Sequence, residues 1–580
     1  MVAVRRGVLL VLALILIAVF VSVGTTVFVA SLARPVATIP QSAALHLRVD
    51  APWSEIEPSD VVQQFLGGRP SLRRTIDMIA RAKDDPRIEV LVIEPAAQTV
   101  LWGQIQELHG ALLDFRSSGK PVVAYLEAAG TADYYLATAA SRIVLMPAGQ
   151  IDLAGLASYE LFFRGALDKI GVYPDLLHIG DYKSASNTFT EYGFTPAHRE
   201  MSESLNRDWF DNLVEAVAEG RGIDIEEART LVGAGPYLAS DALVAGLVDA
   251  LAYEDQLDDQ APVQGTNTID ADDYQRADLT RSGAGRIALL YAVGTITSGE
   301  SQFDSPTGGT VLGSETFTEW VRRARVDPEV DAVVVRIDSP GGSAIASEVI
   351  WRELQLTRDV KPVVVSMGDV AASGGYYIAA PAHTIVAQPG TLTGSIGVVT
   401  GKFVVDGTRE KLGIGTAAAS DGRFAEIYSP FRPFTEDERE RLSEHMRATY
   451  DLFVERVAAG REQPASNIDS VAQGRVWTGR QARELGLVDE LGGLQDAIRI
   501  AIERARLDPQ AGVRIDVYPP KRSIYDVLSN QLGASASTPL GPLGALFGRP
   551  GVEAIGRVAR AVPLFRRGEP LAILPNIFVR

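Results

Sequence analysis

The sequence predicts an α/β protein built from two similar halves that follow a transmembrane helix. Short β-branched runs alternate with helical stretches along most of the chain, which is typical of parallel sheets covered by helices. The two halves align with each other over much of their length, which indicates a tandem duplication. A long apolar run without a charged side chain precedes both halves, and its length suffices to cross a bilayer.

The apolar run covers residues 7–33 and comes directly after Arg5 and Arg6. The positive-inside rule keeps residues 1–6 in the cytoplasm and exports the rest of the chain. A cleaved signal peptide is the alternative, because small residues near the end of the run would suit cleavage. Signal peptides have apolar segments of roughly 7–15 residues, so the greater length of this run favours an uncleaved, single-pass anchor.

The duplication divides the rest of the chain into four parts. We expect a first repeat at 40–256, a polar, turn-rich linker at 257–285 and a second repeat at 286–516. The tail at 517–580 has no counterpart in the first repeat, and it holds more Lys and Arg than Asp and Glu. Such a tail either rests on an anionic membrane surface or forms a poorly ordered extension.

The composition excludes several classes of function. A net charge of -18 argues against a nucleic-acid surface, which needs a basic stripe. The chain has no cysteine, and therefore no disulfide, thiolate nucleophile or cysteine metal site. The six histidines lack metal-ligand spacing, and no phosphate-binding P-loop occurs. We expect no metal, no cofactor and no nucleic-acid partner.

The two repeats differ at a serine. Residues 119–149 align with residues 360–390, and the paired tyrosines of each segment set the register. In this alignment Ser373 lies opposite Thr131, and the glycines that follow Ser373 have no glycine counterparts in the first repeat. The glycines that let a backbone approach a ligand are therefore concentrated in the second repeat.

The repeats differ in the opposite sense at a lysine. Lys183, in "GDYKSASNTF", aligns with a stretch that offers Arg423. Arginine stays protonated in proteins and cannot act as a base, whereas lysine can do so once burial lowers its pKa. The first repeat thus keeps a base without a serine, and the second keeps a serine without a base. This reciprocal loss predicts one active site that is shared by the two repeats.

A serine hydroxyl needs an adjacent base to become a nucleophile, and a desolvated lysine is an accepted partner. The amides of Gly341, in "DSPGG", and of Gly374 suit an oxyanion hole. His383 lies in a turn and strand after Ser373 and is a poor candidate for the base. Taken singly, Ser373 could be a helix-packing residue, Lys183 a solvated surface charge and the glycines a turn; the reciprocal pattern favours the site.

These segments together resemble a known family. The stretches "DSPGG" (338–342), "AASGGYYIAA", "GTLTGSIGV" (390–398) and "GDYKSA" are similar to motifs of the signal peptide peptidase A family, in its long, tandem-domain form. The resemblance covers roughly residues 40–515 and includes the duplication, so it is specific. It implies a Clp/crotonase-like fold and a membrane-anchored serine endopeptidase that degrades cleaved signal peptides.

The resemblance also implies roles for single residues. Ser373 would be the nucleophile, Lys183 the general base and Ser395, in "TGSIG", a serine that orients the lysine amine. The resemblance also implies that the protein lies in the cell inner membrane, with the bulk of the chain in the periplasm. It further implies apolar peptide substrates and assembly into a tetramer.

Two other functions stay open at the level of sequence. A crotonase-type acyl-CoA enzyme would also use paired backbone amides as an oxyanion hole, but the anchor and Ser373 weigh against it. A non-catalytic membrane scaffold, in which the motifs are relics, is the second alternative.

Overall fold

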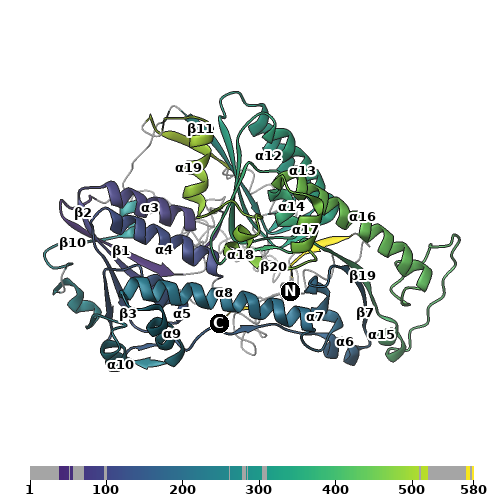
Figure 1. Cartoon of the computed structure of the whole chain (residues 1–580), viewed down its shortest axis with the longest axis horizontal. Helices are drawn as coiled ribbons and strands as arrows, with labels where there is room; N and C mark the ends of the chain where they lie inside the picture. The colour runs from purple at the N-terminus through teal and green to yellow at the C-terminus, as the bar shows by residue number, and fades with distance from the viewer. Residues whose placement is uncertain are drawn as a thin grey trace, which may run out of the picture.

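The structure is a computed structural model of the whole chain (Figure 1). It describes residue 22 and residues 38–50, 53–56, 71–96, 101–259, 262–276, 283, 285–302, 310–508, 511–519, 570–574 and 578–579. The predicted anchor at 7–33 lies outside these residues except for Ser22, and most of the 517–580 tail does so too. Among the described helices, none combines the length and the apolar character that crossing a membrane requires.

The first half contains a six-stranded parallel sheet in the order β10-β1-β2-β3-β4-β9. Its strands are β1 (Ala43–Asp50), β2 (Ile88–Ala96), β3 (Val122–Leu126), β4 (Arg142–Leu145), β9 (Ala250–Leu251) and β10 (Asn267–Asp270). Further short strands of this half are β5 (Gln150–Ile151), β6 (Ser158–Tyr159) and β8 (Tyr237–Leu238). The helices are α3 (Leu72–Asp84), α4 (Trp102–Ser117), α5 (Thr131–Ala137), α6 (Arg164–Ile170), α7 (Asn187–Thr190), α8 (Pro196–Arg221), α9 (Ile225–Ala234), α10 (Ala239–Val244) and α11 (Ala271–Arg276), with 3-10 turns at Ser184–Ser186 and Glu254–Asp259.

The second half repeats this arrangement. The parallel order β11-β14-β16-β17-β21 corresponds to β1-β2-β3-β4-β9, while β22, β18 and β20 extend the sheet. Its strands are β11 (Gly285–Val293), β14 (Ala332–Ser339), β16 (Val363–Ala372), β17 (Thr384–Ala387), β18 (Leu392–Gly394), β20 (Val476–Thr478), β21 (Glu490–Leu491) and β22 (Val513–Tyr518). Its helices are α12 (Ser314–Val326), α13 (Ala344–Arg358), α14 (Gly374–Ala379), α15 (Asp406–Lys411), α16 (Glu436–Arg461), α17 (Ala465–Val471), α18 (Gly479–Glu484) and α19 (Leu494–Arg504).

Local sequence accounts for these elements. Almost every side chain of β14 is buried, because helices cover both faces of a parallel sheet, and such strands are continuous apolar runs. The start of α16 is a capping box, in which Thr435 Oγ1 accepts the N–H of Glu438 and the Glu438 carboxylate accepts the N–H of Thr435.

A third sheet joins the two halves, in the order β13-β12-β15-β23-β19-β7. Its strands are β7 (Tyr173–Ile179), β12 (Thr295–Thr297), β13 (Val311–Gly313), β15 (Gly341–Ser343), β19 (Val398–Val404) and β23 (Leu571–Ile573). Strand β7 comes from the first half and pairs antiparallel with β19 of the second half. Strand β23 comes from the tail and pairs antiparallel with both β15 and β19.

Two segments differ from the sequence-based expectation. The stretch at 257–285, expected to be a linker, supplies β10 at the edge of the first sheet and the helix α11, whose Tyr274 is fully buried. The described part of the tail adds β23 to the third sheet and β24 (Phe578–Val579) beside β6. The composition of the two segments did not reveal these strands, because short strands of this kind are held by backbone hydrogen bonds that many sequences can make.

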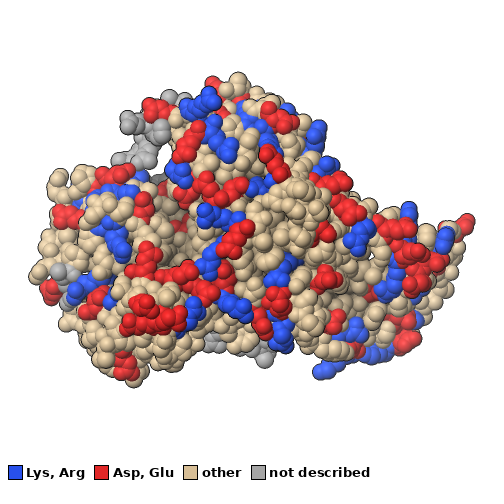
Figure 2. All heavy atoms as spheres, in the orientation of Figure 1, with Lys and Arg blue, Asp and Glu red and all other residues tan. Residues whose placement is uncertain are grey.

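Further contacts fix the halves against each other. The long helix α8 of the first half passes beneath β20 in Figure 1, and its Trp209 donates from Nε1 to the carbonyl of Gly390 at 3.0 Å. Arg480 of the second half pairs with Asp208 and Glu215 of α8, each at 2.8 Å. On the face seen in Figure 2, acidic and basic side chains are interspersed, as expected of a soluble surface without a basic stripe.

Asp175 of β7 should contribute strongly to the stability of the contact between the two halves. Its buried carboxylate accepts the backbone N–H of Phe434 at 2.6 Å and pairs with Arg439 of α16. Replacing Asp175 with Ala leaves both donors unpaired, so we expect a loss of about 1–3 kcal/mol. Urea unfolding followed by circular dichroism would show a lower midpoint for this variant. The exposed change Glu203→Ala should have no such effect, and equal midpoints for the two variants would contradict the assignment.

Candidate active site

Ser373 occupies a sharp turn between β16 and α14. Its backbone has φ 56° and ψ -114°, a conformation that side chains rarely adopt and that functional sites retain under constraint. The Ser373 N–H donates to the carbonyl of Gly394 at 2.8 Å, and the Ser373 carbonyl accepts from Tyr377 at 2.8 Å. These bonds hold the turn, and the side chain is completely buried.

Lys183 reaches this serine from the other half of the chain. It lies just after β7, and its side chain is 1% exposed. Its Nζ is 2.8 Å from Ser373 Oγ and 3.0 Å from both the side-chain and the carbonyl oxygen of Ser395. The structure therefore brings together the serine, the lysine and the orienting serine that the sequence singled out.

Burial lowers the pKa of the Lys183 amine well below its ordinary value. An uncharged amine has two N–H groups and one lone pair. The two oxygens of Ser395 suit the two N–H groups, which leaves the lone pair to accept the hydrogen of the Ser373 hydroxyl. The geometry is that of a base beside a potential nucleophile.

Gly474 makes room for the lysine. It has φ +76°, and a Cβ at this position would lie 2.5 Å from the Cβ of Lys183. The neighbouring Gln473 carbonyl accepts the N–H of Tyr182 at 2.9 Å. Sequence reasoning missed Gly474, because its importance comes from a contact between segments almost 300 residues apart in the chain.

The glycines near Ser373 lie face to face. A Cβ on Gly341 would fall 2.7 Å from the nitrogen of Gly374, and a Cβ on Gly374 would fall 3.1 Å from the nitrogen of Gly342. The Gly341 N–H donates to Ser339 Oγ at 3.2 Å, while the register places Gly342 opposite Ala572 of β23. Gly342, which the sequence did not single out, therefore faces a peptide strand beside the two predicted donors.

The discarded candidates lie elsewhere. Arg423 is exposed and pairs with Asp437 at 2.8 Å. His383 accepts the N–H of Val363 through Nδ1 at 3.1 Å, as part of a strand end. Among the described residues, no cluster of three or more His, Asp or Glu could hold a metal ion.

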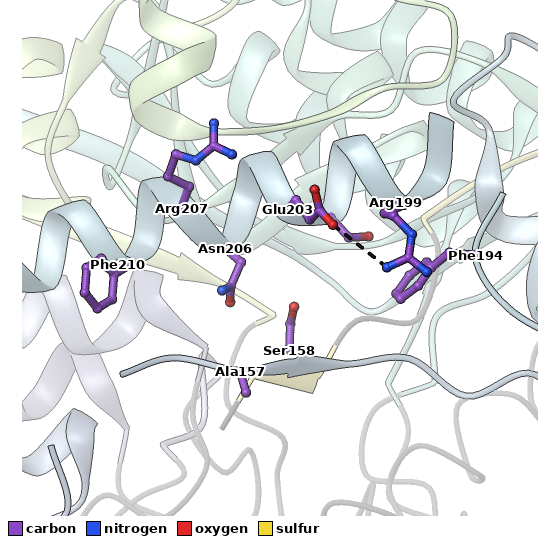
Figure 3. Close-up of a pocket in the computed structure, with 9 residues that line it drawn as sticks. Ala157, Ser158, Phe194, Arg199, Glu203, Asn206, Arg207 and Phe210 are labelled. Carbon is purple, nitrogen blue, oxygen red and sulfur yellow. Dashed lines mark ion pairs between the residues drawn. The ribbon is translucent and has the colours of Figure 1, made fainter. Parts of the chain in front are cut away.

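A cavity of about 460 Å³ lies next to β6 and α8 (Figure 3). Its lining includes Phe194, Arg199 and Phe210, and Ser158 of β6 closes it from below. Ser158 pairs with Val579 of β24. The cavity thus borders the path of the C-terminal segment and not the Ser373–Lys183 pair.

Lys183 should make stability depend on pH. Its pKa is lowered in the folded protein, so the unfolded chain binds one more proton between that lowered pKa and the ordinary value, and stability rises with pH across this window. Replacing Lys183 with Met should raise the urea midpoint at pH 7 and remove the part of its pH dependence that this amine contributes below about pH 10, roughly the ordinary lysine pKa.

The exposed Lys169 offers a matched control for this measurement, since Lys169→Met should leave the pH dependence of the midpoint as it is in the parent. An unchanged slope in Lys183→Met would mean that the amine is charged in the folded protein.

The family model described as Peptidase family S49 matches residues 114–264 and 355–508. The Arabidopsis thaliana protein named Serine protease SPPA, chloroplastic, is 32% identical over 83% of this chain and 75% of its own length. Protease 4 of Salmonella typhi is 35% identical over 80% of this chain and 76% of its own length.

A shorter match joins 32% of this chain with 54% of an Enterococcus faecium protein named Putative signal peptide peptidase SppA, at 35% identity. A ClpP1 mutant from Listeria monocytogenes aligns with 36% of this chain and 94% of its own at 14% identity and a TM-score of 0.24. The long matches establish the family: the chain belongs to peptidase family S49 and is a serine peptidase.

Proposed function

We propose that the protein is a membrane-anchored endopeptidase in which Ser373 is the nucleophile and Lys183 the general base, acting on cleaved signal peptides and similar apolar peptides. The observation that supports this best is the 2.8 Å contact between Lys183 Nζ and Ser373 Oγ, in a buried place that lowers the pKa of the amine.

The reaction follows from this geometry. Lys183 accepts the Ser373 proton as Oγ attacks the peptide carbonyl, and the same proton then passes to the departing amine. Water, activated by the neutral lysine, hydrolyses the resulting ester and frees Ser373. Backbone amides of Gly374 and of the 341–342 loop would stabilise the oxyanion; for Gly341 this requires its N–H to leave Ser339 Oγ.

The tail strand supports a peptide substrate. β23 lies between β15 and β19 as an added antiparallel strand, the way in which many proteins bind extended peptides. Its Leu571 and Ile573 are buried against Ala185, Phe189 and Val399. A track that holds two large apolar side chains suits the apolar core of a signal peptide.

The cellular setting is part of the same proposal. The charge-free run at 7–33 supports an inner-membrane anchor with the active site in the periplasm. The shared strand order of the two halves supports tandem Clp/crotonase-like repeats, and the resemblance to the long-form family supports a tetramer. Membership of a peptidase family disfavours the acyl-CoA and scaffold alternatives.

Removing either member of the pair should abolish peptide cleavage. We expect Ser373→Ala and Lys183→Ala each to lower kcat/KM by about a thousandfold or more, because the two groups act as a unit. Hydrolysis of a fluorogenic apolar peptide by the detergent-solubilised full chain measures this. The exposed changes Ser117→Ala and Lys169→Ala serve as controls, and cleavage at the parental rate by both pair variants would contradict the mechanism.

If β23 occupies the peptide track, a chain that ends at Glu569 should bind substrate better. We expect its KM for an extended apolar peptide to fall about tenfold with kcat nearly unchanged, because no strand must be displaced first. A synthetic peptide spanning residues 569–575 should then inhibit the shortened chain competitively. An unchanged KM, together with no inhibition by the peptide, would place the substrate elsewhere.

A further inference from the structure

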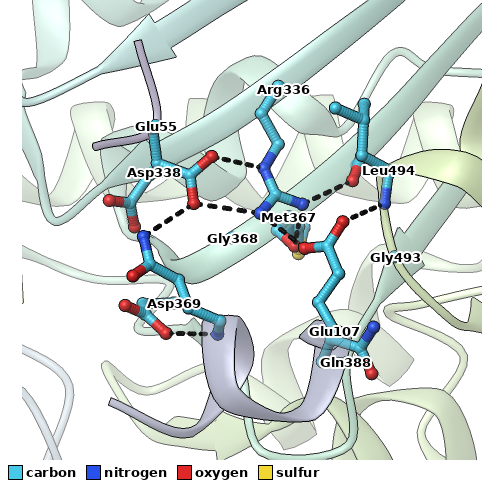
Figure 4. A network of polar contacts seen from close by, with 12 residues as sticks. Glu55, Glu107, Arg336, Asp338, Met367, Gly368, Asp369, Gln388, Gly493 and Leu494 are labelled. Atoms are coloured by element: carbon cyan, nitrogen blue, oxygen red, sulfur yellow. Dashed lines mark hydrogen bonds and ion pairs between the residues drawn. The ribbon is translucent and has the colours of Figure 1, made fainter. Parts of the chain in front are cut away.

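A cluster of charged side chains, most of them buried, lies where the two halves meet (Figure 4). It contains one guanidinium, from Arg336 of β14, and four carboxyl groups. The carboxyl groups belong to Glu55 before α3, Glu107 of α4, Asp338 of β14 and Asp369 of β16. Arg336 is 1% exposed. Glu55, Glu107 and Asp369 are each less than 10% exposed, and Asp338 is half-buried.

Arg336 is fully used within this cluster. It forms two hydrogen bonds with Glu55, at 2.9 and 3.0 Å, and one with Glu107 at 2.7 Å. Its remaining N–H groups donate to Ser366 Oγ at 2.9 Å and to the carbonyl of Met367 at 3.3 Å. The two glutamates therefore already use the single positive charge, which leaves none for a further carboxylate.

Asp338 and Asp369 have no such partner. Each accepts backbone N–H groups: Asp338 from Val370 at 3.0 Å, and Asp369 from Gln104 at the start of α4 at 2.8 Å. Neither forms an ion pair within the described part of the chain. With all four carboxyl groups ionised the cluster would hold three uncompensated negative charges, a costly state inside a protein.

Among the described residues, no second cation pairs with these carboxyl groups. Arg73 of α3 lines a small cavity beside Glu55 and Arg336, but it pairs with Asp77 at 3.4 Å. From the start of α19, the Leu494 N–H donates to Glu107 at 2.6 Å.

Both aspartates act on the backbone that shapes the active site. The β14–β16 register passes from Ile337↔Met367 to Ser339↔Ala371, so three residues of β16 bulge opposite Asp338 alone. The Asp338 carboxyl holds this bulge through Val370. After Asp338, the chain leaves β14 and enters the loop with Gly341 and Gly342. After the bulge, β16 leads directly to Ser373.

We propose that Asp338 and Asp369 are positioning residues, and that the active site is assembled only while this pair carries at least one proton. With at least one proton, the pair adds at most one negative charge beside Arg336 and its two glutamates. A second negative charge repels the first across the bulge, which loosens the link between the oxyanion loop and the serine turn.

The shifts in the pKa values of the four carboxyl groups agree with this geometry. Burial, together with the nearby Glu55, raises the pKa of Asp338 to about 7. Burial, together with Asp338, raises the pKa of Asp369 well above its ordinary value. Burial also raises the pKa of Glu107, while Arg336 outweighs burial and lowers the pKa of Glu55. The last proton of the pair should therefore leave no lower than about pH 7. Since the folded protein holds protons that the unfolded chain releases, stability falls as pH rises toward that point.

The first test concerns activity, and in this form the inference rests on the proposed function. The parent should lose kcat at acidic pH, where Lys183 is protonated, and again at alkaline pH, once the last proton of the aspartate pair has left. The double variant Asp338→Asn/Asp369→Asn carries amides that imitate the protonated acids. We expect its kcat at neutral pH to stay within about threefold of the parent and its alkaline loss to move upward by about one pH unit or more. Asp208→Asn, at another contact between the halves, should keep the parental profile.

The second test does not depend on catalysis. Trp53 lies two residues before Glu55, and Trp102 lies two residues before Gln104. In the Ser373→Ala background, tryptophan emission should therefore change at the alkaline transition. The same emission should not change when the two Asn substitutions are added. The proposal is overturned if the parent has no alkaline transition, if the double variant keeps it unchanged, or if the folded double variant is inactive at neutral pH while the parent is active. The emission change could be lost in the double variant while Ser373→Ala cleaves peptide at the parental rate. That result would contradict the proposed function but support the titration of the aspartate pair.

Discussion

Strand β7 of the first half pairs with β19 of the second along seven residues, from Tyr173↔Val404 to Ile179↔Val398. The pairing is antiparallel, so the chain that leaves β7 and the chain that enters β19 meet at the same end of the ladder. Lys183 follows β7 by four residues, and Ser395 precedes β19 by three. A backbone ladder between the halves thus brings the amine to its two oxygen partners and, through them, to Ser373.

The site that this ladder assembles is costly to fold. Ser373 and Ser395 both have positive φ angles, of 56° and 52°. The Lys183 amine is buried, and no carboxylate of the described residues pairs with it. Strained backbones persist only where the surroundings determine them. Here the bonds from Ser373 to Gly394 and from Ser395 to Arg475 hold both turns, and the packed sheets on either side supply the stability that the site lacks.

Much of the fold and of the site could be predicted. The β-branched runs indicated the parallel strands, and the comparison of repeats paired Ser373 with Lys183 before any distance was known. Other features gave no local signal. Gly474 matters through its contact with Lys183, and β23 becomes a strand because β15 and β19 leave it an edge. Buried charges such as Arg336 resemble surface residues in sequence, since charged side chains are usually exposed.

By itself, the sequence determined the chemistry available to this protein: a serine in one repeat, a lysine in the other, glycines beside the serine and no thiol. Residue type and repeat alignment are local properties of the chain. The tertiary structure alone decided that β7 crosses to the sheet of the other half, that the Lys183 amine is desolvated and that four carboxyl groups lie in one cluster with a single arginine. Desolvation and charge balance depend on which distant segments exclude water from a group, and no stretch of sequence records that.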